Sequence, residues 1–190
     1  MKLSNKLILA SGSPRRKQLL KDAGLDFEVK TVPFEETFPK EMATEKVAEF
    51  LALGKNEAHR AALGDEIILT ADTVVVFNGQ ILGKPKDDQE ATKTLTLLSG
   101  KIHEVITGVC ISSASKQFSF SSTTKVCFCQ LSDEEITHYV NHYKPMDKAG
   151  SYAIQEWIGL IGIEWIEGSY YNVVGLPVQE VYALLKKEFI

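Results

Sequence analysis

A turn and a helix start near the N-terminus could bind an anion. Residues 11–16 (SGSPRR) follow a short apolar run and precede a helical pattern. Ser13 fits an N-cap, and Pro14 fits the first helical position, where the missing N–H of proline costs nothing. Free N–H groups at a helix start bind anions, and two adjacent arginines add charges suited to phosphate. The segment therefore indicates either a phosphate-binding corner or a surface helix with two solvated arginines.

A carboxylate interrupts a strongly apolar stretch. Residues 67–71 (IILTA) are typical of a buried strand, and residues 74–77 (VVVF) resume the pattern after Asp72 and Thr73. A buried carboxylate is costly unless it is paired or binds a metal. Asp72 is therefore the strongest single candidate for chemistry, and the alternative is an Asp that accepts backbone N–H groups at a strand bend.

Two further acids and a lysine flank predicted elements. Glu35 and Glu36 lie on a loop beyond a predicted strand over residues 27–32. A helix is predicted from Thr44 to Leu63, and Lys55 lies at the edge of its apolar side. Lys55 could bind phosphate, or its stem could pack while its ammonium group reaches water.

A second lysine follows a predicted hairpin. Asn78-Gly79 is a typical two-residue turn, and the returning strand ends at Gly83-Lys84-Pro85. The hairpin could bring Lys84 back near Asp72, although a turn lysine in solvent is the ordinary case.

The remaining elements complete a mixed α/β pattern. The first helix is expected to end at Gly24, and a capping box begins another helix at Ser132. The other expected elements are a helix over 88–98, paired strands over 103–112 and 117–131, a turn into a strand over 147–155, a hairpin of 161–166 with 170–174, and a helix over 178–189.

Composition excludes several classes of protein. The 190 residues are 44% hydrophobic, enough for a full core, and carry a net charge of −4, which argues against nucleic-acid polymers as partners. No apolar run is long enough for a membrane span and the N-terminus lacks a signal-peptide core, so we expect a cytoplasmic protein. Cys110, Cys127 and Cys129 are expected to be reduced. His138 and His142 have a zinc-like spacing without an evident third ligand, so a solvated helix face is expected.

Four segments resemble, in family order, the motifs of the Maf family of nucleoside triphosphate pyrophosphatases. They are residues 9–16 (LASGSPRR), 71–75 with 83–85 (ADTVV and GKP), 147–155 (DKAGSYAIQ) and 172–177 (NVVGLP). Together they span nearly the whole chain. The resemblance implies a single Maf-like domain over residues 1–190. It also implies an α/β fold like that of inosine triphosphate pyrophosphatases, with an elongated mixed sheet, flanking helices and two lobes around a central cleft.

The resemblance implies cleavage of a nucleoside triphosphate between its α and β phosphates, which yields the monophosphate and pyrophosphate. It further implies a cytoplasmic homodimer that depends on a divalent cation, Mg²⁺ or Mn²⁺. The catalytic residues would be Asp72, Glu36 and Lys84. Asp72 would be the general base or would hold the metal that carries the attacking water, with Glu36 as the second carboxylate, so both are candidate metal ligands. The phosphate-binding residues would be Ser11, Arg16 and Lys55.

Three positions bear on substrate choice. Arg15, Thr73 and Gln155 match the specificity positions of the branch that resembles dTTP and UTP pyrophosphatases, whereas the branch that prefers 7-methyl-GTP carries tryptophan in place of Arg15. Glu156 stands where the family pattern has glycine.

Two alternatives to a dTTP/UTP pyrophosphatase stay open. They are a nucleotide-binding regulator of septum formation with little turnover and a 7-methyl-GTP pyrophosphatase.

Overall fold

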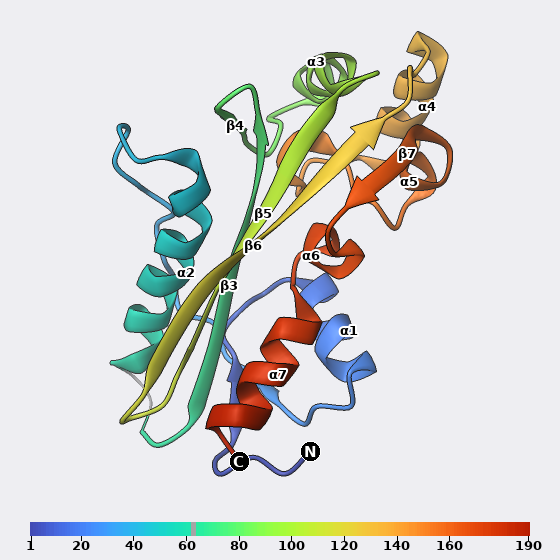
Figure 1. The fold of residues 1–190 in the computed structure, drawn as a ribbon. Helices are drawn as coiled ribbons and strands as arrows, with labels where there is room; N and C mark the ends of the chain where they lie inside the picture. The colour runs from blue at the N-terminus through green and yellow to red at the C-terminus, as the bar shows by residue number, and fades with distance from the viewer. Residues whose placement is uncertain (62–63) are drawn as a thin grey trace. The chain divides into compact units, whose positions relative to one another are not determined.

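Long apolar strands organise the chain, which a computed structural model describes for residues 1–61 and 64–190 (Figure 1). Within these residues, seven strands form one mixed sheet in the order β2-β1-β3-β5-β6-β7, and β4 pairs with β3. The strands are β1 (Leu7–Leu9), β2 (Glu28–Val29), β3 (Ile67–Phe77), β4 (Gln80–Leu82), β5 (Ile102–Ser112), β6 (Gln117–Phe128) and β7 (Ile163–Glu167). The expected mixed α/β sheet with flanking helices is confirmed.

The chain divides into two compact units. Unit 1 comprises residues 1–72, 107–122 and 175–190, and unit 2 comprises residues 73–106 and 123–174. Strands β3, β5 and β6 contribute residues to both units. Of the helices in the described residues, none combines the length and apolar character needed to cross a membrane.

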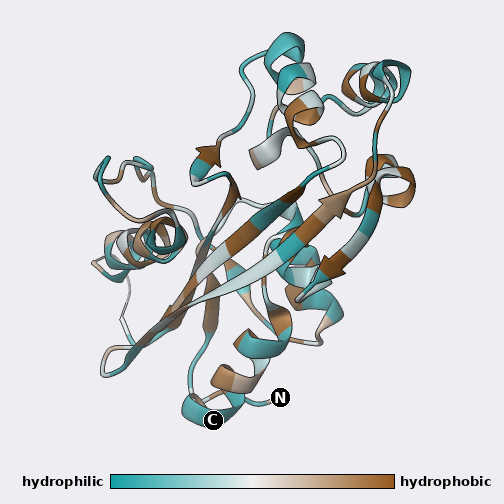
Figure 2. Cartoon of the chain, turned by 45° about the horizontal axis from the view of Figure 1, so that its top comes forward, coloured by the Kyte–Doolittle hydropathy of each residue, from teal (hydrophilic) through white to brown (hydrophobic). Residues whose placement is uncertain are grey.

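In unit 1, helices cover both faces of the strands. Strand β1 runs parallel to β2 and β3. On one face lie α1 (Pro14–Asp22) and α7 (Val178–Glu188), and on the other lies α2 (Thr44–Arg60) (Figure 1). In Figure 2, hydrophobic and hydrophilic residues alternate along α7, as expected of a helix that covers a sheet with one side.

The alternation of side chains along β3 decides which way Asp72 faces. Ile67, Leu69 and Ala71 join the core cluster that contains residues of α1 and α7. Thr70 instead donates a hydrogen bond to the Ala52 carbonyl of α2. Because side chains in a strand alternate between faces, Asp72 shares the face of Thr70 and points toward α2.

Unit 2 has buried apolar clusters of its own and several short helices. The helical segments are α3 (Asp88–Leu98), α4 (Asp133–Tyr143), the 3₁₀ turn η1 (Ala149–Ser151), α5 (Trp157–Gly162) and α6 (Tyr170–Val174). One cluster contains Val75, Val105 and Val126, and side chains from β4, β7, η1 and α6 pack against it. Helices α3 and α4 pack against each other.

Local sequence signals placed many boundaries correctly. Ser13 caps α1 through its side chain, with Pro14 at the first helical position. Asn78 and Gly79 both have positive φ in the β3–β4 turn, and Ser132 with Glu135 forms the expected capping box of α4. The three cysteines are free thiols.

Of the predicted turn into a strand over residues 147–155, the turn is confirmed and the strand is wrong. These residues form the η1 turn followed by irregular backbone. Gly150 and Ser151 have φ of 67° and 63°, a left-handed conformation that cannot continue a strand. The Ala153 N–H donates to the hydroxyl of Tyr139 in place of a strand carbonyl.

The predicted hairpin of residues 161–166 with 170–174 is also wrong in its second half. Residues 163–167 form β7, but residues 170–174 form helix α6, and α5 precedes β7. The Ser169 hydroxyl accepts the N–H of Asn172, as a helix N-cap does, and the Asn172 side chain donates to the Val105 carbonyl. The buried Asn172 amide therefore has a hydrogen-bond partner in the helical segment that is observed.

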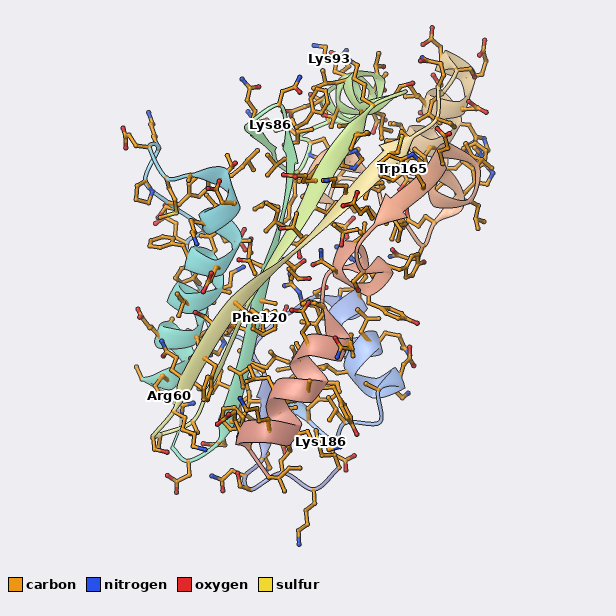
Figure 3. All side chains as sticks on the ribbon, viewed as in Figure 1. Arg60, Lys86, Lys93, Phe120, Trp165 and Lys186 are labelled. Carbon is orange, nitrogen blue, oxygen red and sulfur yellow. The ribbon has the colours of Figure 1, made fainter. Side chains whose placement is uncertain are left out.

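The long second helix differs from its prediction in two details. It ends at Arg60, and residues 62 and 63 of the predicted helix lie outside the described residues. Phe50, a large apolar residue of this helix, is 42% exposed, so the apolar side of the helix is not fully buried. Arg60, labelled in Figure 3, donates to the Ser112 carbonyl and thereby ties the end of α2 to β5.

Candidate functional site

Lys55 holds two carboxylates together in unit 1. Its Nζ lies 2.5 Å from Asp72 Oδ1 and 2.6 Å from Glu36 Oε1. The Lys55 and Asp72 side chains are 14% and 11% exposed, whereas Glu36 is 46% exposed. The cluster therefore has a desolvated side formed by Asp72 and an open side formed by Glu36, and a ligand could reach it from the open side.

Two buried polar residues fix the turn of α2 that carries Lys55. Thr70 of β3 donates to the Ala52 carbonyl at 2.7 Å, and Asn56 donates to the Ile68 carbonyl at 3.2 Å. Both side chains are fully buried. Since Thr70 and Ile68 lie on the strand that delivers Asp72, these bonds set the distance between Lys55 and Asp72. Sequence reasoning missed Asn56, although a polar residue among the buried residues of a helix could have signalled it.

A second pair of contacts fixes the loop that carries Glu36. His59 Nε2 accepts the Val32 N–H at 3.0 Å, so its Nδ1 carries the proton and donates to the Lys55 carbonyl at 2.7 Å. Phe34 packs on Gly54, where an added Cβ would lie 2.7 Å from the ring. Glycine at position 54 lowers the helix propensity of α2, but because it has no side chain it lets the loop approach the helix. His59 was also missed, because no local pattern points to its partner in the loop.

Arg16 is a buried bridge within unit 1. Its Nε donates to the Gly175 carbonyl at 2.8 Å, and its Nη1 donates to the Ser11 hydroxyl at 3.2 Å. Burial lowers the pKa of the guanidinium group, and the negative charge of Asp72 opposes that effect more strongly than that of Glu36 does. Arg16 therefore lies in the electric field of the carboxylate cluster. The reading as a solvated surface arginine is wrong for this residue, which is 9% exposed.

The parallel pairing of β1 and β3 places the turn at Ser11 beside the part of β3 that carries Asp72. Leu9, the last residue of β1, pairs with Leu69 of β3, and Ala10 donates its N–H to the Leu69 carbonyl at 2.9 Å. Strand β3 continues to Phe77, so Asp72 lies within the strand, just beyond its pairing with β1. The turn after β1 therefore begins alongside the residues of β3 that precede Asp72.

Replacement of Arg16 by Met is expected to cost stability as well as activity. We expect a loss of about 2–4 kcal/mol, because the Gly175 carbonyl loses a charged donor and the buried site loses a cation. Urea unfolding measures the change, and the exposed neighbour Lys17→Met provides the matched control. An equal midpoint for the Arg16 and Lys17 variants would contradict the bridging role.

The other three candidates, Thr73, Lys84 and Gln155, belong to unit 2. Thr73 is half-buried, whereas Lys84 and Gln155 are exposed. Gly150 links their segments, because its N–H donates to the Gly83 carbonyl at 3.2 Å and an added Cβ would lie 2.9 Å from Val75 of β3. The turn of Lys84 and the segment of Gln155 are therefore tied to one another.

The carboxylate cluster suits a hard divalent cation. Asp72 Oδ1 and Glu36 Oε1 both lie within 2.6 Å of one nitrogen, so a single small ion in that place could contact both oxygens. Magnesium typically takes one or two protein carboxylates together with substrate phosphates. Although the described residues contain no cluster of three or more His, Cys, Asp or Glu side chains, two carboxylates meet that requirement. His138 and His142 stack on the exposed face of α4, as expected.

The candidates in unit 1 are linked to one another by hydrogen bonds, ion pairs or electrostatic interactions: Ser11, Arg15, Arg16, Glu36, Lys55 and Asp72. Arg15 is half-buried beside Arg16, and its positive charge lowers the pKa of Arg16. These residues come from four segments distant in sequence. Such a gathering of cations and carboxylates can bind a polyanion and position water against it.

Comparisons with known proteins identify relatives over nearly the whole chain. A family model described as Maf-like protein matches residues 6–188. A protein of Phocaeicola vulgatus is 54% identical over 96% of this chain and 95% of its own length. One of Porphyromonas gingivalis is 50% identical over 95% of this chain and 93% of its own length. Both are named dTTP/UTP pyrophosphatase.

Among solved structures, the Staphylococcus aureus Ham1 protein is similar with a TM-score of 0.47 and 18% identity, over 65% of this chain and 72% of that one.

Proposed function

Because the chain belongs to the Maf family, we propose that it is a nucleoside triphosphate pyrophosphatase that hydrolyses dTTP and UTP to the monophosphate and pyrophosphate. The observation that carries the proposal is the Lys55 ammonium bound to both Asp72 and Glu36, beside the buried Arg16. Relatives named for this activity share about half of their residues with the chain. The enzyme would thereby remove these triphosphates, and modified pyrimidine triphosphates, from the nucleotide pool.

Phosphate binding would use the cations and the first helix. A triphosphate is strongly anionic, and attack at its α phosphorus requires that charge to be neutralised. Arg16, Lys55 and Lys84 would supply cations, while the Ser11 hydroxyl and the N–H groups that begin α1 would hold phosphate oxygens. On substrate arrival, Lys55 would exchange carboxylate contacts for phosphate contacts.

The two carboxylates would act on water. Asp72, desolvated on one side, would accept the proton of the attacking water, and Glu36 would orient that water from the open side. Asp72 and Glu36 would also hold a divalent cation, Mg²⁺ or Mn²⁺, which when bound supplies charge neutralisation and lowers the pKa of a water ligand. The pyrophosphate group would leave while paired with Arg16.

Base selection would depend on Arg15, Thr73 and Gln155. The Gln155 amide can donate to O4 of uracil or thymine and accept from N3–H. A site built for this edge rejects an analogue that leaves its polar groups unpaired. The proposal includes a homodimeric, cytoplasmic enzyme in one Maf-like domain over residues 1–190.

Pyrophosphate release from a panel of dTTP, UTP, dCTP, dATP, dGTP and 7-methyl-GTP, with Mg²⁺ or Mn²⁺, tests the proposal. We expect dTTP and UTP to have the highest kcat/KM and the monophosphate to be the second product. Release of orthophosphate would contradict the cleavage position. Tight dTTP binding without turnover would favour the nucleotide-binding regulator.

The variant Gln155→Glu is expected to lower the ratio of kcat/KM for dTTP to that for 7-methyl-GTP by about 10-fold or more. A carboxylate cannot donate to O4, and a stranded buried polar group costs about 1–3 kcal/mol. Steady-state kinetics with both substrates measure the ratio. The exposed Gln80→Glu, also in unit 2, adds the same charge as a control. An unchanged ratio in the Gln155 variant would show that Gln155 does not select the base.

A further inference from the structure

A buried tyrosine connects α4 to the segment that carries Gln155. The Tyr139 hydroxyl donates to Oε2 of Glu156 and accepts the N–H of Ala153, 3.1 Å away. The Tyr139 side chain is fully buried, and burial raises its pKa, with the Glu156 hydrogen bond as the second cause. The phenol therefore stays protonated and can keep both bonds at neutral pH. These bonds hold the residues on both sides of Gln155.

A buried lysine binds the other oxygen of the same carboxylate. Lys148 Nζ lies 3.4 Å from Glu156 Oε1 and 2.7 Å from Asp147 Oδ1, and the Lys148 side chain is 9% exposed. Each oxygen of Glu156 thus has its own partner. A carboxylate bound at both oxygens has little rotational freedom, so it fixes the backbone to which it belongs.

The backbone around Gln155 is held tightly as well. The Glu156 N–H donates to the Ala153 carbonyl at 3.0 Å, and an added Cβ on Gly159 would lie 1.7 Å from the Ile154 carbonyl oxygen. Upstream, the Tyr152 hydroxyl is 2.7 Å from His103 Nε2. Between these anchors, Ala153 and Ile154 are buried while Gln155 is exposed. The segment therefore presents one side chain outward from a fixed support.

The backbone conformation at position 156 does not require a particular residue type. Its φ of −93° is available to any residue, so neither glycine nor glutamate is required there. The carboxylate instead adds contacts to Tyr139 and Lys148 that a glycine at this position could not make. The presence of glutamate at this position is best explained by these two contacts.

We infer that Glu156 is a positioning residue which, held by Tyr139 and Lys148, fixes the Gln155 amide for selection of the base, an inference that rests on the proposed function. Glu156 acts through Gln155 and through the backbone of residues 153–156. Loss of the network would let the segment adopt other conformations, and the amide would then favour pyrimidines less strongly.

Three variants test the inference: Glu156→Ala, Glu156→Gln and Tyr139→Phe. We expect Glu156→Ala and Tyr139→Phe each to lower the dTTP preference over dGTP, measured as the ratio of kcat/KM, by about 5- to 10-fold. Glu156→Gln still accepts the Tyr139 bond but turns its NH2 toward the Lys148 ammonium, so its ratio should fall between those of the wild type and Glu156→Ala. The double variant Tyr139→Phe/Glu156→Ala should lose no more than the larger single effect, because both residues act in one network.

Two controls separate positioning from general destabilisation. Tyr143→Phe and Lys144→Met alter neighbours on or beside α4, and both should leave the ratio unchanged. A variant that only unfolds more easily lowers the rates for both substrates equally, so its ratio stays constant. Hydrogen exchange at the Ala153 amide should accelerate in Tyr139→Phe and not in Tyr143→Phe.

Equilibrium binding of dTTP and dGTP, measured by calorimetry in EDTA, follows the same preference without turnover. If the wild type hydrolyses dTTP but Glu156→Ala keeps its ratio in both kinetics and binding, the inference is wrong and the proposed function stands. If the wild type binds dTTP selectively without hydrolysing it, the proposed function is wrong, and the binding ratios of the variants still decide the inference. If the wild type shows no selectivity, the inference is wrong.

Discussion

Replacement of Asp72 by Asn is expected to lower kcat for dTTP by roughly 10³-fold or more while the protein stays folded. The amide has the same shape but cannot accept a proton from water, and it is a poor ligand for a hard cation. Both losses act on the same step. Lys55 retains Glu36 as an ionic partner at 2.6 Å, so the cost to stability should be small compared with the loss of rate.

The measurement is single-turnover hydrolysis of dTTP at saturating Mg²⁺, with a thermal melt of each protein. Asp88→Asn, which alters an exposed ion pair with Lys144, is the matched control and should retain wild-type turnover. A rate within 10-fold of wild type for Asp72→Asn, with an unchanged melt, would remove Asp72 from the mechanism.

The sequence predicted the strand that carries Asp72 and the helix that carries Lys55, because both have strong periodicity and clear ends. It could not place Lys55 against Asp72. That contact depends on the Thr70 bond to Ala52 and the Asn56 bond to Ile68, which join elements through buried polar atoms. Local patterns carry no information about such partners. The family resemblance identified the candidate site residues but not how they lie relative to one another.

Sequence reasoning failed mainly where side chains replace the backbone as hydrogen-bond partners. The Ala153 N–H bonds to Tyr139, and Asn172 bonds to the Val105 carbonyl, so neither the end of residues 147–155 nor residues 170–174 form the predicted strands. Tertiary partners such as these override local strand propensity.

The burial of Arg16, a charged residue, also could not be predicted from the local sequence. Its helix position and capping serine were predicted correctly, yet its burial depends on the Gly175 carbonyl, which is 159 residues away in sequence. A buried arginine with a backbone partner supports the structure, and under the proposed function Arg16 would also bind phosphate. For that reason its variants should alter stability and turnover at once, unlike those of Asp72.

Replacement of Lys55 by Met is expected to lower kcat/KM for dTTP by about 10²- to 10³-fold, because one fixed cation near the transferred charge contributes on that scale. The variant also leaves Asp72 and Glu36 to repel each other. Since Glu36 is 46% exposed, the loss of stability should be smaller than the roughly 3–5 kcal/mol of a fully buried pair.

The change in melting temperature on addition of Mg²⁺ tests, without a measurement of activity, whether Asp72 and Glu36 bind the cation. In the wild type, an incoming cation must compete with the Lys55 ammonium for Asp72 Oδ1 and Glu36 Oε1. Without that ammonium, Mg²⁺ alone should raise the melting temperature of Lys55→Met more than that of the wild type. Lys30→Met, which alters the exposed pair with Glu66, should respond as the wild type does. If Mg²⁺ stabilises Lys55→Met no more than the Lys30 control, the two carboxylates do not hold the metal, and the cation must bind through the substrate phosphates instead.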